Sequence, residues 1–139
     1  MKIANRMENL SPSVTLAITA LARELKAQGK DILSFSAGEP DFDTPQIVKD
    51  AAIKAINDGQ TKYTAVEGII ATKQAIINKL KKDHGLEYKL DGIVISNGAK
   101  HSLFNLFQVL IEKGDEVIIP APYWVTYPEQ VKFSDGVPV

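Results

Sequence analysis

Four short segments of the sequence carry groups that could act on a small molecule. In the first, residues 96–102, a predicted strand turns into a predicted helix through Asn97 and Gly98, and the helix begins with Ala99 and Lys100. The free backbone N–H groups and the positive end of the dipole at a helix start attract anions. A glycine lets the main chain approach a phosphate, and Lys100 adds a positive charge. The segment therefore predicts a phosphate site, although a strand-to-helix turn can need a glycine for its geometry alone.

Three further segments offer an aromatic ring, a phenol and a close backbone donor. Trp124, the only tryptophan, follows the carboxyl end of a predicted buried strand, where ligands of open α/β sheets bind. Its indole can stack on a flat heterocycle, or it can simply pack over the sheet edge. The phenol of Tyr63 can hydrogen-bond a phosphate oxygen, although a half-buried surface tyrosine is the simpler interpretation of this residue taken alone. Gly38, in the loop 37–45, can offer its backbone N–H to a carboxylate.

Composition excludes several other kinds of site and partner. The chain has no cysteine, which excludes disulfides, thiolate metal sites and a cysteine nucleophile, and fits a cytoplasmic protein. Asp41 and Asp43 suit turn and cap positions, and no ligand set for a metal surrounds them. With 16 Lys+Arg against 17 Asp+Glu, a nucleic-acid partner is not expected. The sequence shows neither a signal-peptide pattern nor an apolar run of roughly 18 residues, so we expect no membrane partner.

Helical patterns alternate with strand patterns along the chain. Helices are predicted over residues 14–28, 45–57, 69–84, 99–113 and 123–132. Ser13 is the expected N-cap of the first helix, and Gly29 its stop. For the second helix we expect Thr44 at the N-cap and Pro45 at the first helical position.

Strands are predicted over residues 32–35, 92–96, 116–119 and 137–139. The continuous apolar run of 92–96 is typical of a strand buried on both faces. A strand, a helix and another strand in succession imply a parallel sheet with a crossover helix. The predicted fold class is therefore α/β, with an incomplete, mostly parallel sheet and flanking helices.

Taken in order, the four segments resemble the class I pyridoxal-phosphate aminotransferases, and most of all the bacterial aspartate aminotransferase branch. The stretches that carry the resemblance are AGEPDFDTP (37–45), TKYT (61–64), NGAK (97–100) and PAPYWVTYPE (120–129). The resemblance implies a large α/β domain, a smaller domain built from both chain ends, and a homodimer with a shared active site. It makes residues 1–45 the N-terminal segment and small-domain part, and residues 46–139 the first, truncated part of the large cofactor-binding domain.

The resemblance also implies a reaction and roles for single residues. The cofactor of the family is pyridoxal 5′-phosphate, and the reaction transfers an amino group from aspartate or glutamate to a 2-oxo acid. Gly38 matches the backbone donor to the substrate α-carboxylate. Tyr63 is similar to the tyrosine that reaches across the dimer to the phosphate of the partner's cofactor. Trp124 matches the aromatic residue that stacks on the cofactor ring and borders the substrate.

The remaining implied roles concern the phosphate turn and its neighbour. Gly98, Ala99 and Lys100 match the turn on the phosphate side of the cofactor. Lys100 alternatively meets the distal carboxylate of an acidic substrate, and the sequence leaves both interpretations open. Thr15 lies near the same substrate pocket by resemblance. His101 replaces a more usual glutamine.

Several parts of the family pattern do not occur in the sequence. After Gly68 the usual Pro-Glu-Leu-Arg is replaced by residues 70–73, Ile-Ala-Thr-Lys. The motifs for the Schiff-base lysine, the aspartate at the pyridine nitrogen and the arginine at the α-carboxylate are missing. We therefore predict the N-terminal portion of an aminotransferase, without a catalytic residue of its own and inactive alone. The alternatives are a non-catalytic, stand-alone binding or assembly module, and a parent enzyme with an aromatic or prephenate-type substrate.

Overall fold

The computed structural model describes residues 2–36 and 38–139. The chain divides into two compact units. Unit 1 combines Met1–Pro40 with Leu103–Val139, and unit 2 is Asp41–Ser102. The helix α4, Ala99–Leu110, begins in unit 2 and continues into unit 1.

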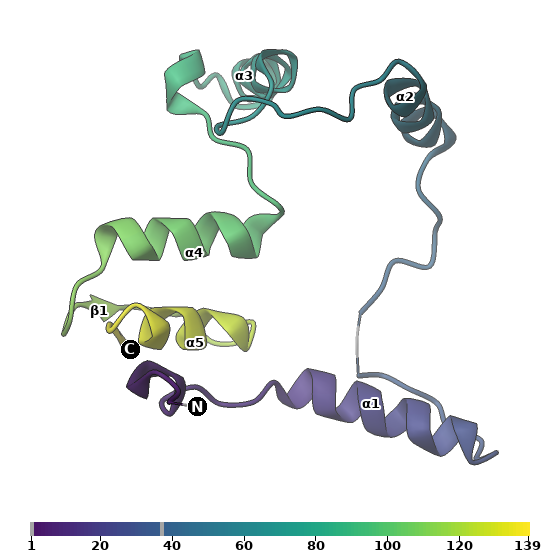
Figure 1. Cartoon of the computed structure of the whole chain (residues 1–139), viewed down its shortest axis with the longest axis vertical. Helices are drawn as coiled ribbons and strands as arrows, with labels where there is room; N and C mark the ends of the chain where they lie inside the picture. The colour runs from purple at the N-terminus through teal and green to yellow at the C-terminus, as the bar shows by residue number, and fades with distance from the viewer. Residues whose placement is uncertain (1, 37) are drawn as a thin grey trace. The chain divides into compact units, whose positions relative to one another are not determined.

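Besides most of α4, unit 1 contains η1 (Asn5–Met7), α1 (Val14–Ala27), β1 (Glu116–Val117), α5 (Thr126–Phe133) and β2 (Val137–Pro138). Unit 1 contains a two-stranded parallel sheet, and its helices α1, α4 and α5 are labelled in Figure 1. The strands β1 and β2 pair in parallel, with Glu116 beside Val137 and Val117 beside Pro138. The N–H of Ile119 extends the ladder by donating to the Val139 carbonyl at 2.8 Å. Since α5 connects the two strands, β1, α5 and β2 form a parallel strand–helix–strand unit.

The helix α5 is the centre of packing in unit 1. Its Val131 is fully buried, with 0% of its surface exposed. The ring of Phe133 lies 5.6 Å from that of Phe104 on α4, a distance typical of packed aromatic pairs. Gln108 on α4 donates a hydrogen bond of 2.7 Å to Ser134 at the end of α5. These contacts hold α4 and α5 side by side, as Figure 1 shows.

Unit 2 consists of helices joined by loops. They are α2 (Gln46–Asn57), α3 (Ile70–His84), η2 (Leu90–Gly92) and the first turn of α4. The turn before α3 is fixed by a 3.0 Å hydrogen bond from the Ile95 N–H to the Glu67 carbonyl. Lys73 on α3 is only 4% exposed, and its ammonium lies 3.8 Å from the Glu67 carboxylate.

The predicted helices are confirmed, with corrections at several ends. Ser13 caps α1 as expected, because its hydroxyl accepts the Leu16 N–H at 3.3 Å. The N-cap of α2 is Pro45 and not Thr44, because the ψ of Pro45 is 139°, outside the helical range. The helix α4 ends at Leu110 and not at 113, since the Glu112 N–H turns to the Asp115 carboxylate at 2.8 Å. The last helix begins at Thr126, three residues later than predicted.

Two of the four predicted strands are wrong for this structure, and the other two are shorter than expected. Residues 32–35 and 92–96 form no strand, and the strands near 116–119 and 137–139 have two residues each. A strand needs a neighbouring strand to receive its backbone hydrogen bonds. The Ile95 N–H instead bonds to a turn carbonyl, that of Glu67. The α/β prediction therefore holds only in its coarser form, a mostly helical chain with two parallel strands.

The chain exposes much more surface than a compact protein of its mass. Its accessible surface is 11828 Å², whereas a compact monomer of its mass exposes about 7,100 Å². Among the described residues, the only buried apolar side chains are Val131, with 0% of its surface exposed, and Ile93, with 9%. No helix in residues 2–36 and 38–139 is both long and apolar enough to cross a membrane. The same residues contain no cluster of three or more side chains suited to a metal ion.

Candidate active site

Three of the predicted site residues, Thr15, Gly38 and Trp124, lie in unit 1. Thr15 is in the first turn of α1, two residues after the Ser13 cap, and is half-buried. Trp124 is in the loop before α5 and is 45% exposed. Its carbonyl accepts the Tyr127 N–H at 3.0 Å, which turns the chain into α5.

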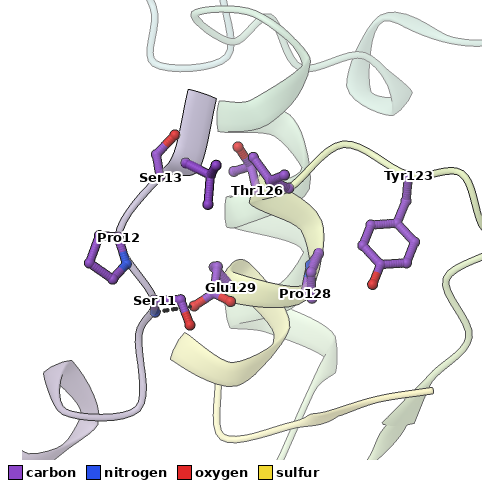
Figure 2. Close-up of a pocket in the computed structure, with 9 residues that line it drawn as sticks. Ser11, Pro12, Ser13, Tyr123, Thr126, Pro128 and Glu129 are labelled. Atoms are coloured by element: carbon purple, nitrogen blue, oxygen red, sulfur yellow. Dashed lines mark hydrogen bonds between the residues drawn. The ribbon is translucent and has the colours of Figure 1, made fainter. Parts of the chain in front are cut away.

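A cavity of about 330 Å³ lies between the start of α1 and the loop that carries Trp124 (Figure 2). The cavity is lined by Ser11, Pro12, Ser13, Val14, Tyr123, Val125, Thr126, Pro128 and Glu129. Val14 precedes Thr15 in the chain, and Tyr123 and Val125 are the neighbours of Trp124 on either side. The structure therefore gathers the segments of two predicted site residues around one cavity.

Glu129 connects the two sides of this cavity. One carboxylate oxygen, Oε2, accepts the backbone N–H of Ser11 at 2.8 Å, across 118 positions of sequence. The other, Oε1, accepts from the Lys132 ammonium at 2.9 Å. Partial burial raises the pKa of Glu129, but the Ser11 N–H and Lys132 outweigh it and hold the pKa below its ordinary value. Glu129 is therefore held as a carboxylate.

Hydroxyl groups connect α1 to the segment that leads to Gly38. Thr19 donates its hydroxyl proton to the Thr15 carbonyl at 2.8 Å and lies 3.3 Å from the Ser36 hydroxyl. Because the Thr19 proton is already used, Ser36 is the donor in the second bond. Ser34 lies 2.9 Å from Ser36 and extends the chain of hydroxyls.

The loop around Gly38 keeps its backbone accessible. Ala37, which belongs to the predicted motif, lies outside the described residues. Gly38 itself is exposed, and no heavy atom lies within 4 Å of the position that a Cβ would occupy. A carboxylate can therefore approach the Gly38 backbone. Further along the loop, the Asp43 carboxylate accepts the Thr44 N–H at 2.8 Å and forms an ion pair with Lys49, which suits the predicted turn role.

The predicted phosphate turn, with Gly98, Ala99 and Lys100, lies at the start of α4. Gly98 has a φ of 87°, a conformation that L side chains rarely adopt, and no heavy atom lies near its missing Cβ. Its carbonyl accepts the N–H groups of His101 and Ser102 at 3.1 and 3.2 Å, which starts the helix. The first N–H groups of an α-helix have no acceptor within the helix. An open helix start led by glycine is a fitting donor set for a phosphate group.

His101, in the first turn of α4, stabilises the turn around Gly98. Its Nδ1 accepts the backbone N–H of Asn97 at 3.1 Å. The side chain that replaces the family's more usual glutamine therefore closes the turn around Gly98.

Tyr63 lies in unit 2 and is fully exposed. The interpretation of this residue as a half-buried surface tyrosine is therefore wrong for this structure. An exposed phenol is free of the packing that would prevent it from reaching another molecule.

Sequence reasoning missed the residues that join these segments. Glu129, Ser11, Thr19 and Ser36 were not predicted to take part. Glu129 belongs to the PAPYWVTYPE stretch, but a bond to a residue 118 positions away leaves no local pattern.

The chain matches known proteins in sequence and in structure. A family model described as aminotransferase class I and II matches residues 30–139. The chain is 58% identical to an aspartate aminotransferase of Geobacillus stearothermophilus over 139 residues, which is 35% of that protein. It is 55% identical over its whole length to an aspartate/prephenate aminotransferase of Nitrosomonas europaea, again 35% of that protein. The solved structure of an aspartate aminotransferase from Thermus thermophilus with maleate superposes with a TM-score of 0.94 at 44% identity, covering all of this chain and 36% of that one.

The predicted family and the partial coverage of its members are confirmed by these matches. The chain spans about a third of the length of the relatives that it matches. The family model covers well over half of the 139 residues. The chain belongs to the class I and II aminotransferase family.

Proposed function

We propose that this chain is part of a pyridoxal-phosphate enzyme that transfers an amino group from aspartate or glutamate to a 2-oxo acid. The observation that carries the proposal is the match to aspartate aminotransferases along the whole chain. The open, glycine-led start of α4 supports it, because this element suits the phosphate of such a cofactor.

Three segments of this chain would hold the cofactor. The backbone of Gly98 and Ala99 at the start of α4 would bind its phosphate, and the ring of Trp124 would stack on its pyridine. The exposed Tyr63 would reach the phosphate held by a second subunit of a homodimer. Pyridoxal phosphate, when bound, supplies an electron sink for carbanion chemistry at the substrate Cα.

Two segments would bind and orient the amino acid. The accessible N–H of Gly38 would donate to the substrate α-carboxylate, and Thr15 would border the side-chain pocket next to Trp124. Lys100 has two candidate partners, the cofactor phosphate and the distal carboxylate of an acidic substrate. Oriented binding of this kind lowers the entropic part of the barrier before any bond changes.

The longer protein would supply what these residues lack. The relatives are nearly three times as long as this chain, and by resemblance the lysine that carries the cofactor would belong to the remaining part of the enzyme. We propose that residues 1–45 belong to the small domain of the complete enzyme and residues 46–139 to the first part of its large domain.

The test is an amino-transfer assay of the longer protein with aspartate and 2-oxoglutarate. We expect turnover that needs pyridoxal phosphate and that the 139-residue chain alone does not show. Absence of turnover in the longer protein, with cofactor added, would overturn the proposal. Turnover by the 139-residue chain would contradict its assignment as an incomplete enzyme.

Lys100→Met in the longer protein separates the two partners of Lys100. If Lys100 binds the phosphate, the variant releases pyridoxal phosphate more readily and loses activity toward all amino donors. If it binds the distal carboxylate, KM rises for aspartate and stays unchanged for an uncharged donor such as tyrosine.

A second candidate function is amino transfer to prephenate. It is favoured by the 55% identity to the aspartate/prephenate enzyme, which is nearly as high as the 58% identity to the aspartate enzyme. The same assay with prephenate as acceptor decides between the two.

A further inference from the structure

The segment before α1 is held on α5 by two contacts of different kinds. Near its start, the Arg6 guanidinium lies 5.6 Å from the centre of the Phe133 ring, within the range of a cation–π contact. Near its end, the Ser11 N–H donates to Glu129 at 2.8 Å. We call residues 5–13 the N-terminal arm. These two contacts fix both ends of the arm against one helix.

Ser11, which donates to Glu129, lies only two residues before Ser13, the N-cap of α1. Ser11 is followed by Pro12, whose φ is fixed by its ring, and then by the cap residue Ser13. A stiff connection of this length transmits the position of Ser11 directly to the first turn of α1, where Thr15 lies. Figure 2 shows the Glu129 carboxylate reaching from α5 to Ser11 along this side of the cavity.

The geometry points to Glu129 as a positioning residue, which sets the start of α1, and with it Thr15, beside the loop that carries Trp124. This inference rests on the proposed aminotransferase function, because it gives Thr15 and Trp124 a common substrate. Glu129 itself touches no reacting atom. It is held by Ser11 and Lys132, with only 23% of its side chain exposed, so it is ordered before a substrate arrives.

The contact is suited to this task because a charge-assisted hydrogen bond is shorter and stronger than a neutral one. Its loss would leave the Ser11 N–H without its acceptor at the edge of the cavity. Of the two contacts described above, only that of Arg6 with Phe133 would then remain, and the start of α1 could move away from Tyr123 and Val125. Binding of the amino acid would weaken, while the chemistry of an already bound substrate would change little.

The test compares Glu129→Ala with Lys132→Ala in the longer holoenzyme. Lys132→Ala is a matched control on the same helix, because it removes the ion pair and keeps the Ser11 bond. For Glu129→Ala we expect amide hydrogen exchange over residues 9–16 to be at least tenfold faster than in the wild type. We expect KM for the amino donor to rise about five- to tenfold with kcat within twofold. Lys132→Ala is expected to change each quantity less than twofold.

The outcomes separate this inference from the proposed function. If the wild-type protein transfers no amino group, the proposed function fails and this inference fails with it. If the wild type is active but Glu129→Ala leaves exchange over residues 9–16 or KM unchanged, only the role of Glu129 is overturned. A general loss of kcat without a change in KM would also contradict it, because that pattern indicates structural damage and not weaker binding of the amino donor. Should Glu129→Ala not fold, Glu129→Gln keeps the side-chain volume. For this variant we expect the exchange rate over residues 9–16 and KM each to rise about two- to fivefold.

Discussion

At the scale of single residues, local chemistry decided which predictions could be made. Gly98 was predicted because a strand-to-helix turn with a following lysine is a recognisable pattern, and its φ of 87° shows why a glycine is needed. Trp124 and Gly38 were singled out by their neighbours in the sequence. Glu129 and Ser11 were missed, because their contact depends on two segments 118 positions apart.

Gly68 is a residue whose identity the fold requires for two reasons. Its φ is 105°, and an added Cβ would lie 2.8 Å from three side-chain atoms of Ile95. Gly59 has a φ of 75° but open space around it. We expect Gly59→Ala to cost about 1 kcal/mol from backbone strain alone, and Gly68→Ala at least about 2 kcal/mol because overpacking adds to the strain. Urea unfolding of the longer protein measures both values, and equal costs would show that Ile95 yields without penalty.

At the scale of elements, the helices were predictable, whereas two of the four predicted strands, 32–35 and 92–96, do not form. A helix satisfies its own backbone, and its ends are set by nearby residues such as Ser13 at the start of α1 and Gly85, in the left-handed conformation, after α3. A strand depends on a partner that can come from anywhere in the chain. The apolar run 92–96 has strand-like composition, but its Ile95 N–H bonds to the Glu67 carbonyl. The parallel pair that forms is β1 with β2, around α5.

The contact between the N-terminal arm and α5 predicts a pH dependence of stability. The pKa of Glu129 is held below the ordinary value of 4.5, so the folded protein binds the Glu129 proton less tightly than the unfolded chain does. The stabilisation is therefore complete above about pH 4.5 and is lost as the pH falls through the lowered pKa. We expect Glu129→Gln to reduce the free energy of unfolding by about 1 kcal/mol at pH 7. Urea unfolding of the longer protein should show this difference shrinking below pH 4.5, whereas a difference that grows in acid would contradict the ionised contact.

At the scale of the whole molecule, composition was a poor guide to how much of the chain is buried. With 45% hydrophobic residues, the sequence resembles that of an ordinary globular domain. The structure exposes 11828 Å², and apolar side chains such as Phe35 and Ile47 lie at its surface. Composition counts apolar residues but does not say what they pack against. The coverage of only 35% of the relatives offers a source for the missing partners, since the longer protein would bury these faces.

This excess of surface predicts how the 139-residue chain behaves without the rest of the protein. Each square ångström of apolar surface removed from water contributes about 25 cal/mol, and the chain leaves about 4,700 Å² more total surface exposed than a compact monomer of its mass. We therefore expect the isolated chain to bind a hydrophobic dye such as ANS strongly and to unfold without a cooperative transition in urea. The longer protein, measured in parallel, should bind little dye and unfold cooperatively. A sharp transition and a defined oligomer for the isolated chain would contradict this expectation, because two or more copies would then cover the apolar faces themselves, as the hypothesis of a stand-alone assembly module requires.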